Sequence, residues 1–349
     1  MTFRALLPAR GGRRHDGGRT TMRRVNRVRA AVIRKYGAPD VLRVEEVAEP
    51  MPGPHDVQIE VAASSVNPID YKTRSGSIFF MSGLRFPKIL GGDVAGVVRS
   101  CGEAVTHLKP GDAVYGFSSA ATRGGGYAEV MCCEAAKLAR KPEGLSMSEA
   151  AAVPLAGITA YQALYRQGEM KPGMRVLVTG ATGGVGHLAV QVARAAGCQV
   201  TGVCHSRNRE LAFELGCEEV ICYDKADFRE RRGGYELIFD AAAKFGYRPC
   251  RGALSEHGIY VSTIPGPSLM LRHLLSRFGS GRRARFVGAH ANTADLERLG
   301  ELAREGKLRP HIEHRLPLEQ IAEAHRLSES ERVRGKIVIE IGAATERRV

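Results

Sequence analysis

The sequence predicts an α/β protein in which a β-rich unit precedes a doubly wound parallel sheet. Between about residues 30 and 140, short β-prone runs are separated by Gly, Pro and Asp, which is typical of a barrel-like all-β unit. Between 174 and 290, β-prone runs alternate with helical ones, and this alternation predicts βαβ units. The stretch between them, "SMSEAAAVPLAGITAYQALY", has helical periodicity, with Ser146 or Ser148 as its N-cap.

The individual elements follow in chain order. In the β-rich unit the expected strands are 29–37, 42–50, 56–68, 92–102, 111–117 and 125–133. In the parallel sheet they are 175–180, 198–204, 218–223, 236–243, 258–264 and 285–290. Two amphipathic helices, 293–306 and 318–330, then precede a closing strand at 335–342. The segment "HIEH" at 311–314 is expected to be a surface loop.

The net charge of +14 is concentrated at the start of the chain of 349 residues. Residues 1–29 hold nine Arg and one Asp, so more than half of the excess lies there, and we expect residues 1–28 to be a disordered basic arm. Such an arm fits a transit peptide, a nucleic-acid-binding tail, or an upstream translation start with Met22 as the natural first residue. We favour the last, which predicts a cytoplasmic protein without a nucleic-acid partner. No apolar run is long enough to predict a membrane span.

The motif "VTGATGGVG" follows a β-prone run and opens a helix, and this context predicts a dinucleotide-binding turn. Its pattern is Ala181-x-Gly183-x-x-Gly186, a G-x-G-x-x-G turn with Ala in first place, and Thr182, Gly184 and Val185 fill the remaining positions. Gly183 would let the backbone approach a pyrophosphate, and Gly186 would let the helix pack closely on the strand. Free N–H groups at the helix start would favour the anion.

The end of the next strand, "VCHSRNRE", predicts which nicotinamide cofactor binds. An NAD site usually has an Asp or Glu there, whereas this sequence offers His205, Ser206 and Arg207. A carboxylate would repel a 2′-phosphate. Ser206 could donate a hydrogen bond to one, and Arg207 could form a bidentate ion pair with it. We therefore expect NADP(H), although Arg207 could also be an ordinary solvated side chain.

Several segments together resemble the medium-chain dehydrogenase/reductase superfamily, in its zinc-independent quinone-oxidoreductase-like branch. They are "AAVIRKYGAPDVLRVEEV", "SSVNPIDYKTRSG", "FPKILGGDVAGVV", "VGHLAV" and "RGKIVIEI", and the likeness extends from about residue 30 to 342. It implies a GroES-like catalytic domain, residues 29–152 and 291–349, with a Rossmann cofactor-binding domain, residues 153–290, inserted between its parts. It also implies an active site between the domains and a homodimer.

The same resemblance implies that no metal is bound. At the positions where zinc-containing relatives have ligands, this sequence has Asn67, Gly92 and Leu155, none of which suits zinc. The eight cysteines form no C-x-x-C pair. Without a Lewis acid, reduction of a quinone or an α,β-unsaturated carbonyl is favoured, because the charge spreads over a hydroquinonate or enolate.

The residue roles that the resemblance implies are expectations. The alternatives are that Asn67-Pro68 only shapes a turn, that Lys72 is a surface cation, and that the further cofactor-contact residues serve ordinary core or loop packing. Asn67 would contact the substrate or the nicotinamide ribose, Lys72 would lie near both, Asp70 would orient them, and Tyr71 is a weaker proton-donor candidate. The further cofactor contacts would come from Thr159, Tyr223, Ala241, Ala242, Thr263, Ile264 and Lys336. The apolar segment 75–90, with Phe79, Phe80 and Met81, could line the substrate pocket, pack internally or form a dimer contact.

These expectations predict an NADPH-dependent, metal-free quinone or enone reductase. Two alternatives stay open from the sequence. One is a metal-free alcohol or aldehyde dehydrogenase, which a substrate panel would distinguish. The other is a non-catalytic protein that binds NADPH or nucleic acid; binding to nucleic acid should then weaken steeply with salt and largely vanish when residues 1–28 are deleted.

Overall fold

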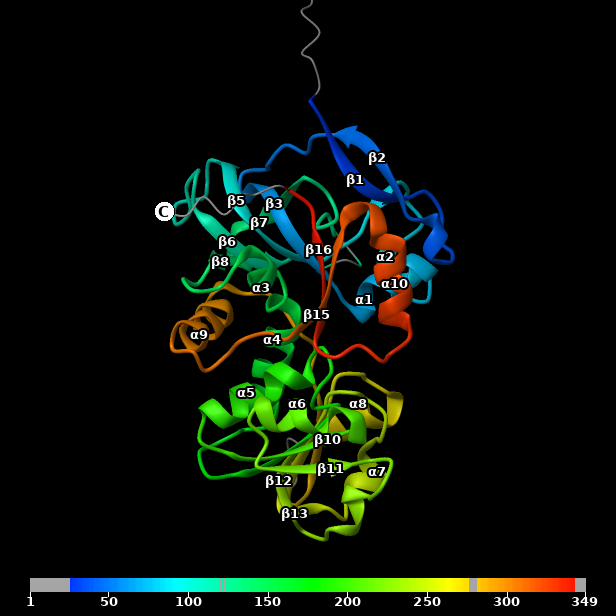
Figure 1. The fold of residues 1–349 in the computed structure, drawn as a ribbon, viewed down its shortest axis with the longest axis vertical. Helices are drawn as coiled ribbons and strands as arrows, with labels where there is room; N and C mark the ends of the chain where they lie inside the picture. Colours follow the sequence, from blue (N-terminus) through cyan, green and yellow to red (C-terminus); the bar gives the residue numbers. More distant parts are fainter. Residues whose placement is uncertain (1–25, 120, 122, 276–280, 343–349) are drawn as a thin grey trace, which may run out of the picture.

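The chain is described by a computed structural model that covers residues 26–119, 121, 123–275 and 281–342. Its β-rich unit occupies the upper part of Figure 1 and its parallel sheet the lower part. Residues 1–25 of the predicted basic arm lie outside the described residues. The first strand, β1, begins at Arg27, so the last two residues assigned to the arm belong to a sheet.

The β-rich unit contains two sheets. The smaller has the order β2-β1-β4, and the larger has the order β15-β16-β3-β5-β6-β8, with β7 also paired to β3. Their bounds are β1 Arg27–Ile33, β2 Arg43–Ala48, β3 Asp56–Val66, β4 Lys88–Ile89, β5 Asp93–Cys101, β6 Ala113–Phe117, β7 Val130–Glu134, β8 Leu138–Arg140, β15 Ile312–Pro317 and β16 Lys336–Glu340. The larger sheet thus joins strands from both ends of the chain. The antiparallel pair of β3 and β16 sets Val66 opposite Ile337, which brings the residues at 67 and 336 together.

The parallel sheet has the order β11-β10-β9-β12-β13-β14. Counted along the chain this is 3-2-1-4-5-6, the order of dinucleotide-binding doubly wound sheets. The strands are β9 Arg175–Thr179, β10 Gln199–Cys204, β11 Glu219–Cys222, β12 Tyr235–Asp240, β13 Leu254–Ser262 and β14 Arg283–Phe286. The helices that accompany them are α5 Gly186–Ala195, α6 Arg209–Glu214, α7 Tyr247–Cys250 and α8 Pro267–Leu275. All six predicted strands of this sheet are present.

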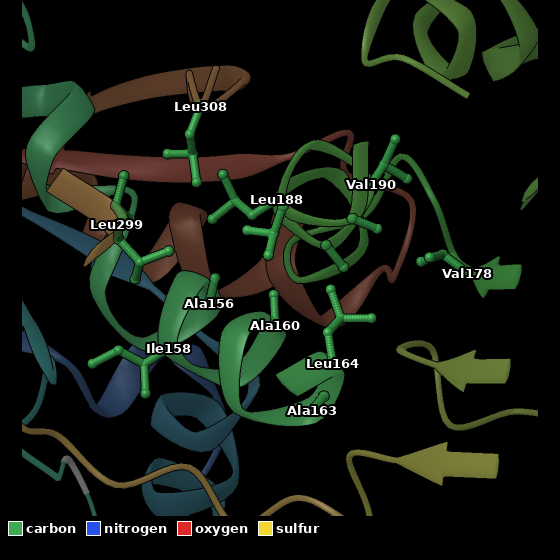
Figure 2. Close-up of a cluster of buried hydrophobic side chains, with 14 of the residues drawn as sticks. Ala156, Ile158, Ala160, Ala163, Leu164, Val178, Leu188, Val190, Leu299 and Leu308 are labelled. Atoms are coloured by element: carbon green, nitrogen blue, oxygen red, sulfur yellow. The ribbon is translucent and has the colours of Figure 1, made fainter. Parts of the chain in front are cut away.

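A continuous apolar core joins the two units. Its members come from the α4 region, from α5 and β9 of the parallel-sheet unit and from α9 (Figure 2). Small residues allow close packing here: a Cβ added to Gly157 of α4 would lie 3.0 Å from Leu299 of α9. The remaining helices are α1 Pro68–Ser75, α2 Phe79–Ser82, α3 Met147–Ala151, α4 Pro154–Tyr161, α9 Thr293–Arg304 and α10 Ile321–Glu329. Ser146 caps α3 by accepting from the N–H of Glu149, so it is the N-cap of the two predicted candidates.

The structure corrects one prediction. "HIEH" is not a loop, because residues from Ile312 onward form β15, which pairs in parallel with β16. The run is short and charged and has no apolar alternation, so only its partner strand identifies it. The segment "NPIDYKTRSG" also contains a helix, α1, which begins at Pro68 and is stabilised where the Asp70 carboxylate accepts from the N–H of Asn67.

Candidate cofactor and substrate site

A cavity of about 920 Å³ lies between the two units, at the carboxyl ends of β9 and β10. One wall comes from the parallel sheet and includes the glycine-rich turn, and the other comes from the β-rich unit. Ligands of doubly wound sheets bind at this edge, where the strand order reverses. Its volume is in the range of small-molecule and cofactor sites.

The glycine-rich turn between β9 and α5 has the geometry that the sequence predicts. A Cβ at Gly186 would stand 2.0 Å from the carbonyl oxygen of Gly180, so only glycine allows this packing. A Cβ at Gly183 would have one neighbour within 4 Å, Gly180 O at 3.3 Å. Among the described residues, the N–H groups of Gly184 and Val185 have no hydrogen-bond partner in the chain. Free amides beside a helix start, with an open approach, fit a pyrophosphate.

The glycine-rich turn is held by a contact with His187, a residue that was not among the predicted site residues. Its Nδ1 lies 2.9 Å from the carbonyl oxygen of Gly183. Burial lowers the pKa of His187 to about 3, so the ring is neutral. A carbonyl only accepts, which means that Nδ1 carries the proton and donates it to the turn.

Three residues at the end of β10 were predicted to select the cofactor, and two of them lie at the cavity surface. His205 and Arg207 line the cavity, and Tyr223 lines it at the end of β11 with its ring edge-on to His205. Ser206 is engaged elsewhere, because its Oγ donates to Asp224 at 2.7 Å and its N–H donates to the same carboxylate at 2.8 Å. These hydrogen bonds lower the pKa of Asp224. Asp224 was not among the predicted residues, because it belongs to the end of the neighbouring strand.

The wall from the β-rich unit is built around Asn67, which is almost completely buried and lines the cavity. Its Nδ2 donates to Asp93 Oδ2 at 2.8 Å, and its Oδ1 accepts from Lys336 Nζ at 2.6 Å. Lys336 Nζ also lies 3.4 Å from the carbonyl oxygen of Val66 and 3.7 Å from Asp93 Oδ2. Burial lowers the pKa of Lys336, while Asp93 and Asp70 oppose that effect.

Asp93 is the centre of this cluster and is fully buried. Besides Asn67 it accepts from Ser65 Oγ at 2.5 Å and, through Oδ1, from the N–H of Leu155 at 2.9 Å. Asn67 and Leu155, which stand at two of the positions where the resemblance places zinc ligands, therefore meet around this carboxylate. The signal for Asp93 was a single acid at the start of the apolar run "GDVAGVV".

Behind Asn67, Asp70 is fully buried, and burial raises its pKa to about 7. This value is the balance between burial and the neighbouring Asp93, which raise the pKa, and the Asn67 hydrogen bond and Lys336, which lower it. Asp70 Oδ1 and the Tyr127 hydroxyl are both buried without a hydrogen-bond partner. Asp70 does not line the cavity and acts on it through Asn67.

The other predicted residues divide between the cavity surface and positions behind it. Those that line it are Asn67, Tyr71, Thr182, Gly183, Gly184, Val185, Gly186, His205, Arg207, Tyr223, Ala241, Ala242 and Lys336. Those outside its lining are Asp70, Lys72, Thr159, Ala181, Ser206, Thr263 and Ile264. Thr159 donates to Leu155 O at 2.6 Å within α4. Burial raises the pKa of Tyr71, so its hydroxyl keeps its proton.

The mouth of the cavity contains an ion pair that the sequence did not predict. Lys244, after β12, lies 2.6 Å from Glu331, after α10, and both residues line the cavity. The backbone is unusual at Glu331, which has φ +54°, and at Ala243, the residue before Lys244, which has φ +53°. Non-glycine residues in this region are uncommon and cluster at functional sites.

The apolar segment after α1 lies apart from this site. Phe79, Phe80 and Met81 belong to α2, are 55%, 74% and 52% exposed, and are not among the residues that line the cavity. Of the three predicted roles, the described side chains therefore support neither lining of this pocket nor internal packing. A dimer contact stays a prediction.

Comparisons with known proteins agree with this architecture. Sequence models of two families match: an alcohol dehydrogenase GroES-like domain over residues 53–143, and a zinc-binding dehydrogenase over residues 215–339. The chloroplastic quinone-oxidoreductase QR1 of Triphysaria versicolor is 33% identical over 309 residues, which cover 86% of this chain and 94% of that protein. The mitochondrial NAD(P)H oxidoreductase RTN4IP1 of Homo sapiens is 31% identical over 362 residues, covering 92% of this chain and 91% of that protein. The solved quinone oxidoreductase from Coxiella burnetii superposes with a TM-score of 0.83 at 33% identity, covering 91% of this chain and all of that one.

The chain belongs to the medium-chain dehydrogenase/reductase superfamily, in its quinone-oxidoreductase-like branch. It is an oxidoreductase, and the superfamily implies a nicotinamide cofactor. The site fits such a cofactor, because the free amides of Gly184 and Val185 face a cavity that a Cβ at Gly183 would narrow. The predicted GroES-like and Rossmann architecture is confirmed.

The described residues of this dehydrogenase/reductase contain no group of three or more His, Cys, Asp or Glu side chains placed to hold a metal ion. None of their helices is long and apolar enough to span a bilayer.

Proposed function

We propose that this oxidoreductase uses NADPH to reduce a quinone or an α,β-unsaturated carbonyl without a metal. The observation that carries the proposal is the cavity itself, which sets a phosphate-binding turn opposite a wall of buried hydrogen-bonding side chains. NADPH is favoured by Arg207, which lines the cavity at the end of β10 where an NAD site has an acid. Asp224 argues for NADH, but its carboxylate already accepts two hydrogen bonds from Ser206.

The residues of the chain would divide the work as follows. The bound cofactor supplies a hydride. The turn and Gly183 hold its diphosphate, while His205, Arg207 and Tyr223 contact its adenosine end. Asn67 donates a hydrogen bond to the acceptor oxygen on which charge develops during hydride transfer. Tyr71, whose hydroxyl keeps its proton, is the candidate that gives a proton to the reduced product.

The absence of a metal is proposed from the chemistry of the side chains. An amide, a glycine and a leucine occupy positions 67, 92 and 155, and Asn67 is already bonded to Asp93 and Lys336. A quinone or enone needs less charge stabilisation than a simple ketone, and hydrogen-bond donors can supply it. A metal assay that finds stoichiometric zinc linked to activity would overturn this part.

The deciding experiment measures oxidation of NADPH and of NADH by the purified chain with a quinone, an enone and an aldehyde in parallel. We expect turnover with the quinone or the enone, faster with NADPH, and little with the aldehyde. Turnover of simple alcohols and aldehydes would instead indicate the dehydrogenase alternative. Failure to bind either dinucleotide would exclude the proposed reaction altogether.

Location and assembly belong to the same proposal. We expect a cytoplasmic homodimer, while the two relatives quoted above are described as chloroplastic and mitochondrial. Fractionation of cells that express the full chain tests the first expectation, and sedimentation tests the second.

A further inference from the structure

The carboxamide of Asn67 is held between one side chain that donates a hydrogen bond to it and another that accepts a hydrogen bond from it. Lys336 Nζ donates to Asn67 Oδ1 at 2.6 Å. Asp93 Oδ2 accepts from Asn67 Nδ2 at 2.8 Å. A rotated carboxamide would set its oxygen against the acceptor Oδ2 and its nitrogen against the donor Nζ. The two neighbours therefore admit one orientation of Asn67.

This arrangement uses the carboxamide oxygen and one of the two N–H bonds of Nδ2. The second N–H has no partner among the described residues, and Asn67 lines the cavity. We propose that Asp93 and Lys336 are a positioning pair that fixes Asn67 so that this second N–H donates to an oxygen atom of the substrate. The inference rests on the proposed function, since it assigns that oxygen to a quinone or enone carbonyl.

Asn67 also belongs to the start of a helix. It is the N-cap residue of α1, and in a capping box the Asp70 carboxylate accepts from the N–H of Asn67. The hydrogen bonds of the Asn67 side chain to Asp93 and Lys336 connect this helix start to β5 and β16.

The free-energy cost of burying Asp93 and Lys336 also supports a positioning role for the pair. Asp93 is fully buried and Lys336 is 3% exposed, and removing two such charges from water is expensive. Their closest approach, 3.7 Å, is longer than the hydrogen bonds that each makes to Asn67. The pair therefore acts through Asn67 more than through direct contact, as expected for groups that set an orientation.

The test compares two variants that each remove one hydrogen bond from the same oxygen of Asp93. Asp93→Asn supplies an amide that can donate to Asn67 Oδ1, so the carboxamide is free to rotate. Ser65→Ala removes the 2.5 Å bond from Ser65 Oγ but leaves Asn67 and Lys336 in place. We expect Asp93→Asn to lower kcat with a quinone by about 10- to 100-fold and Ser65→Ala by less than about 3-fold.

The kinetic isotope effect separates positioning from loss of folded protein. With NADPH deuterated at the transferred position, Asp93→Asn should raise the isotope effect on kcat, because hydride transfer becomes slower relative to the other steps. A variant with fewer folded molecules shows a lower rate with an unchanged isotope effect. Equal rates and equal isotope effects in the two variants would overturn the proposal.

A second measurement does not depend on turnover. In the unsubstituted chain, NMR should show two distinct Nδ2 protons for Asn67, of which only the one not bonded to Asp93 shifts when a hydroquinone is added with oxidised cofactor. In Lys336→Met, which removes the donor to Oδ1, this selectivity should be lost. If the purified chain turns over no quinone or enone, the proposed function fails. If instead both protons or neither shift, the orientation of Asn67 is refuted.

Discussion

The two walls of the cavity are made from different parts of the polypeptide. On the parallel-sheet side, the proposed phosphate contacts are the backbone amides of Gly184 and Val185, and close packing at Gly186 shapes the turn. On the other side the groups are side chains, Asn67, Asp93 and Lys336, connected by hydrogen bonds in a buried cluster. The shape of the first wall requires glycines, which have no Cβ. The hydrogen bonds of the second wall require particular polar side chains.

This difference separates binding from chemistry. A backbone wall binds a diphosphate whatever the substrate is, because every dinucleotide presents the same group. A side-chain wall can be adjusted one residue at a time to the oxygen that accepts charge. Changes to the first wall should therefore affect cofactor affinity, and changes to the second should affect kcat.

The largest effect is expected for Asn67→Asp, which keeps the volume of the side chain but replaces the donor by a carboxylate. We expect kcat with a quinone to fall by roughly 100- to 1,000-fold, as for loss of a donor to a developing oxyanion. Asn208→Asp is the matched control, because Asn208 lines the opposite wall and donates to Thr182 Oγ1 at 3.3 Å. It should raise the KM for the cofactor and leave kcat nearly unchanged. Equal losses of kcat in the two variants would contradict the division between the walls.

On the backbone wall, Gly186→Ala should lower kcat/KM for NADPH by about 100-fold, because its Cβ would stand 2.0 Å from Gly180 O and displace the turn. It should also lower the free energy of unfolding by about 1–3 kcal/mol through overpacking. In Gly183→Ala the nearest contact of the Cβ is 3.3 Å, so this variant should fold normally and lose only affinity. Urea denaturation and fluorescence titration with NADPH measure both quantities. Normal affinity in Gly183→Ala would show that the diphosphate does not lie on the turn.

The contrast between the walls also explains what could be predicted. The turn is encoded within nine consecutive residues, from the end of β9 to the start of α5, so its place in the fold follows from local pattern. The six strands of the parallel sheet were predicted for the same reason. Residues 67 and 336, in contrast, are 269 positions apart and meet only because β3 and β16 pair in one register.

Two misses have related causes. Asp224 reaches Ser206 from the end of the neighbouring strand, 18 residues away, and no spacing rule links the two. The β15 strand carries charged residues without apolar alternation, so its only signal is the partner β16. In both cases the deciding contact is between strands.

Lys72, Thr263 and Ile264 were predicted as site residues from the family resemblance alone. All three lie outside the cavity lining, so a family resemblance does not by itself place a residue in the site.

Asp70, which lies behind the side-chain wall, should make the free energy of unfolding depend on pH. Burial raises the pKa of Asp70 from its ordinary value of 3.8 to about 7. Between these values the unfolded chain has released this proton and the folded chain still holds it. The contribution of Asp70 to stability is thus present at low pH and falls as pH rises, by at most about 1.4 kcal/mol per pH unit, until it levels off above about 7.

Asp70→Asn removes this titration and keeps an oxygen that can accept from Asn67 N–H. The difference in the free energy of unfolding between variant and unsubstituted chain should therefore move in favour of the variant as pH rises from 4 to 7. Urea denaturation at a series of pH values measures it. A constant difference across that range would mean that Asp70 is ionised in the folded protein at low pH.

A smaller effect is expected where side chains assist the backbone wall. Arg207→Ala should lower the ratio of kcat/KM for NADPH to that for NADH by about 10-fold, the scale of a charge-assisted hydrogen bond near solvent. Arg209→Ala is the control, because Arg209 is close in sequence but lies over the ring of Phe213 instead. It should leave the ratio unchanged. An unchanged ratio in Arg207→Ala as well would remove Arg207 from the argument for NADPH.

The ion pair between Lys244 and Glu331 joins the two walls at the mouth of the cavity, so it tests whether they act independently. Both side chains are more than half exposed, which limits such a pair to about 0–1 kcal/mol. Lys244→Met should therefore raise the KM for NADPH by no more than about 3-fold, and added salt should reduce the difference. Lys307→Met, which breaks a comparably exposed pair with Glu305 away from the cavity, should change neither. If kcat fell with KM in Lys244→Met but not in Lys307→Met, the two walls would have to move together during turnover, and the separation of binding from chemistry would fail at their junction.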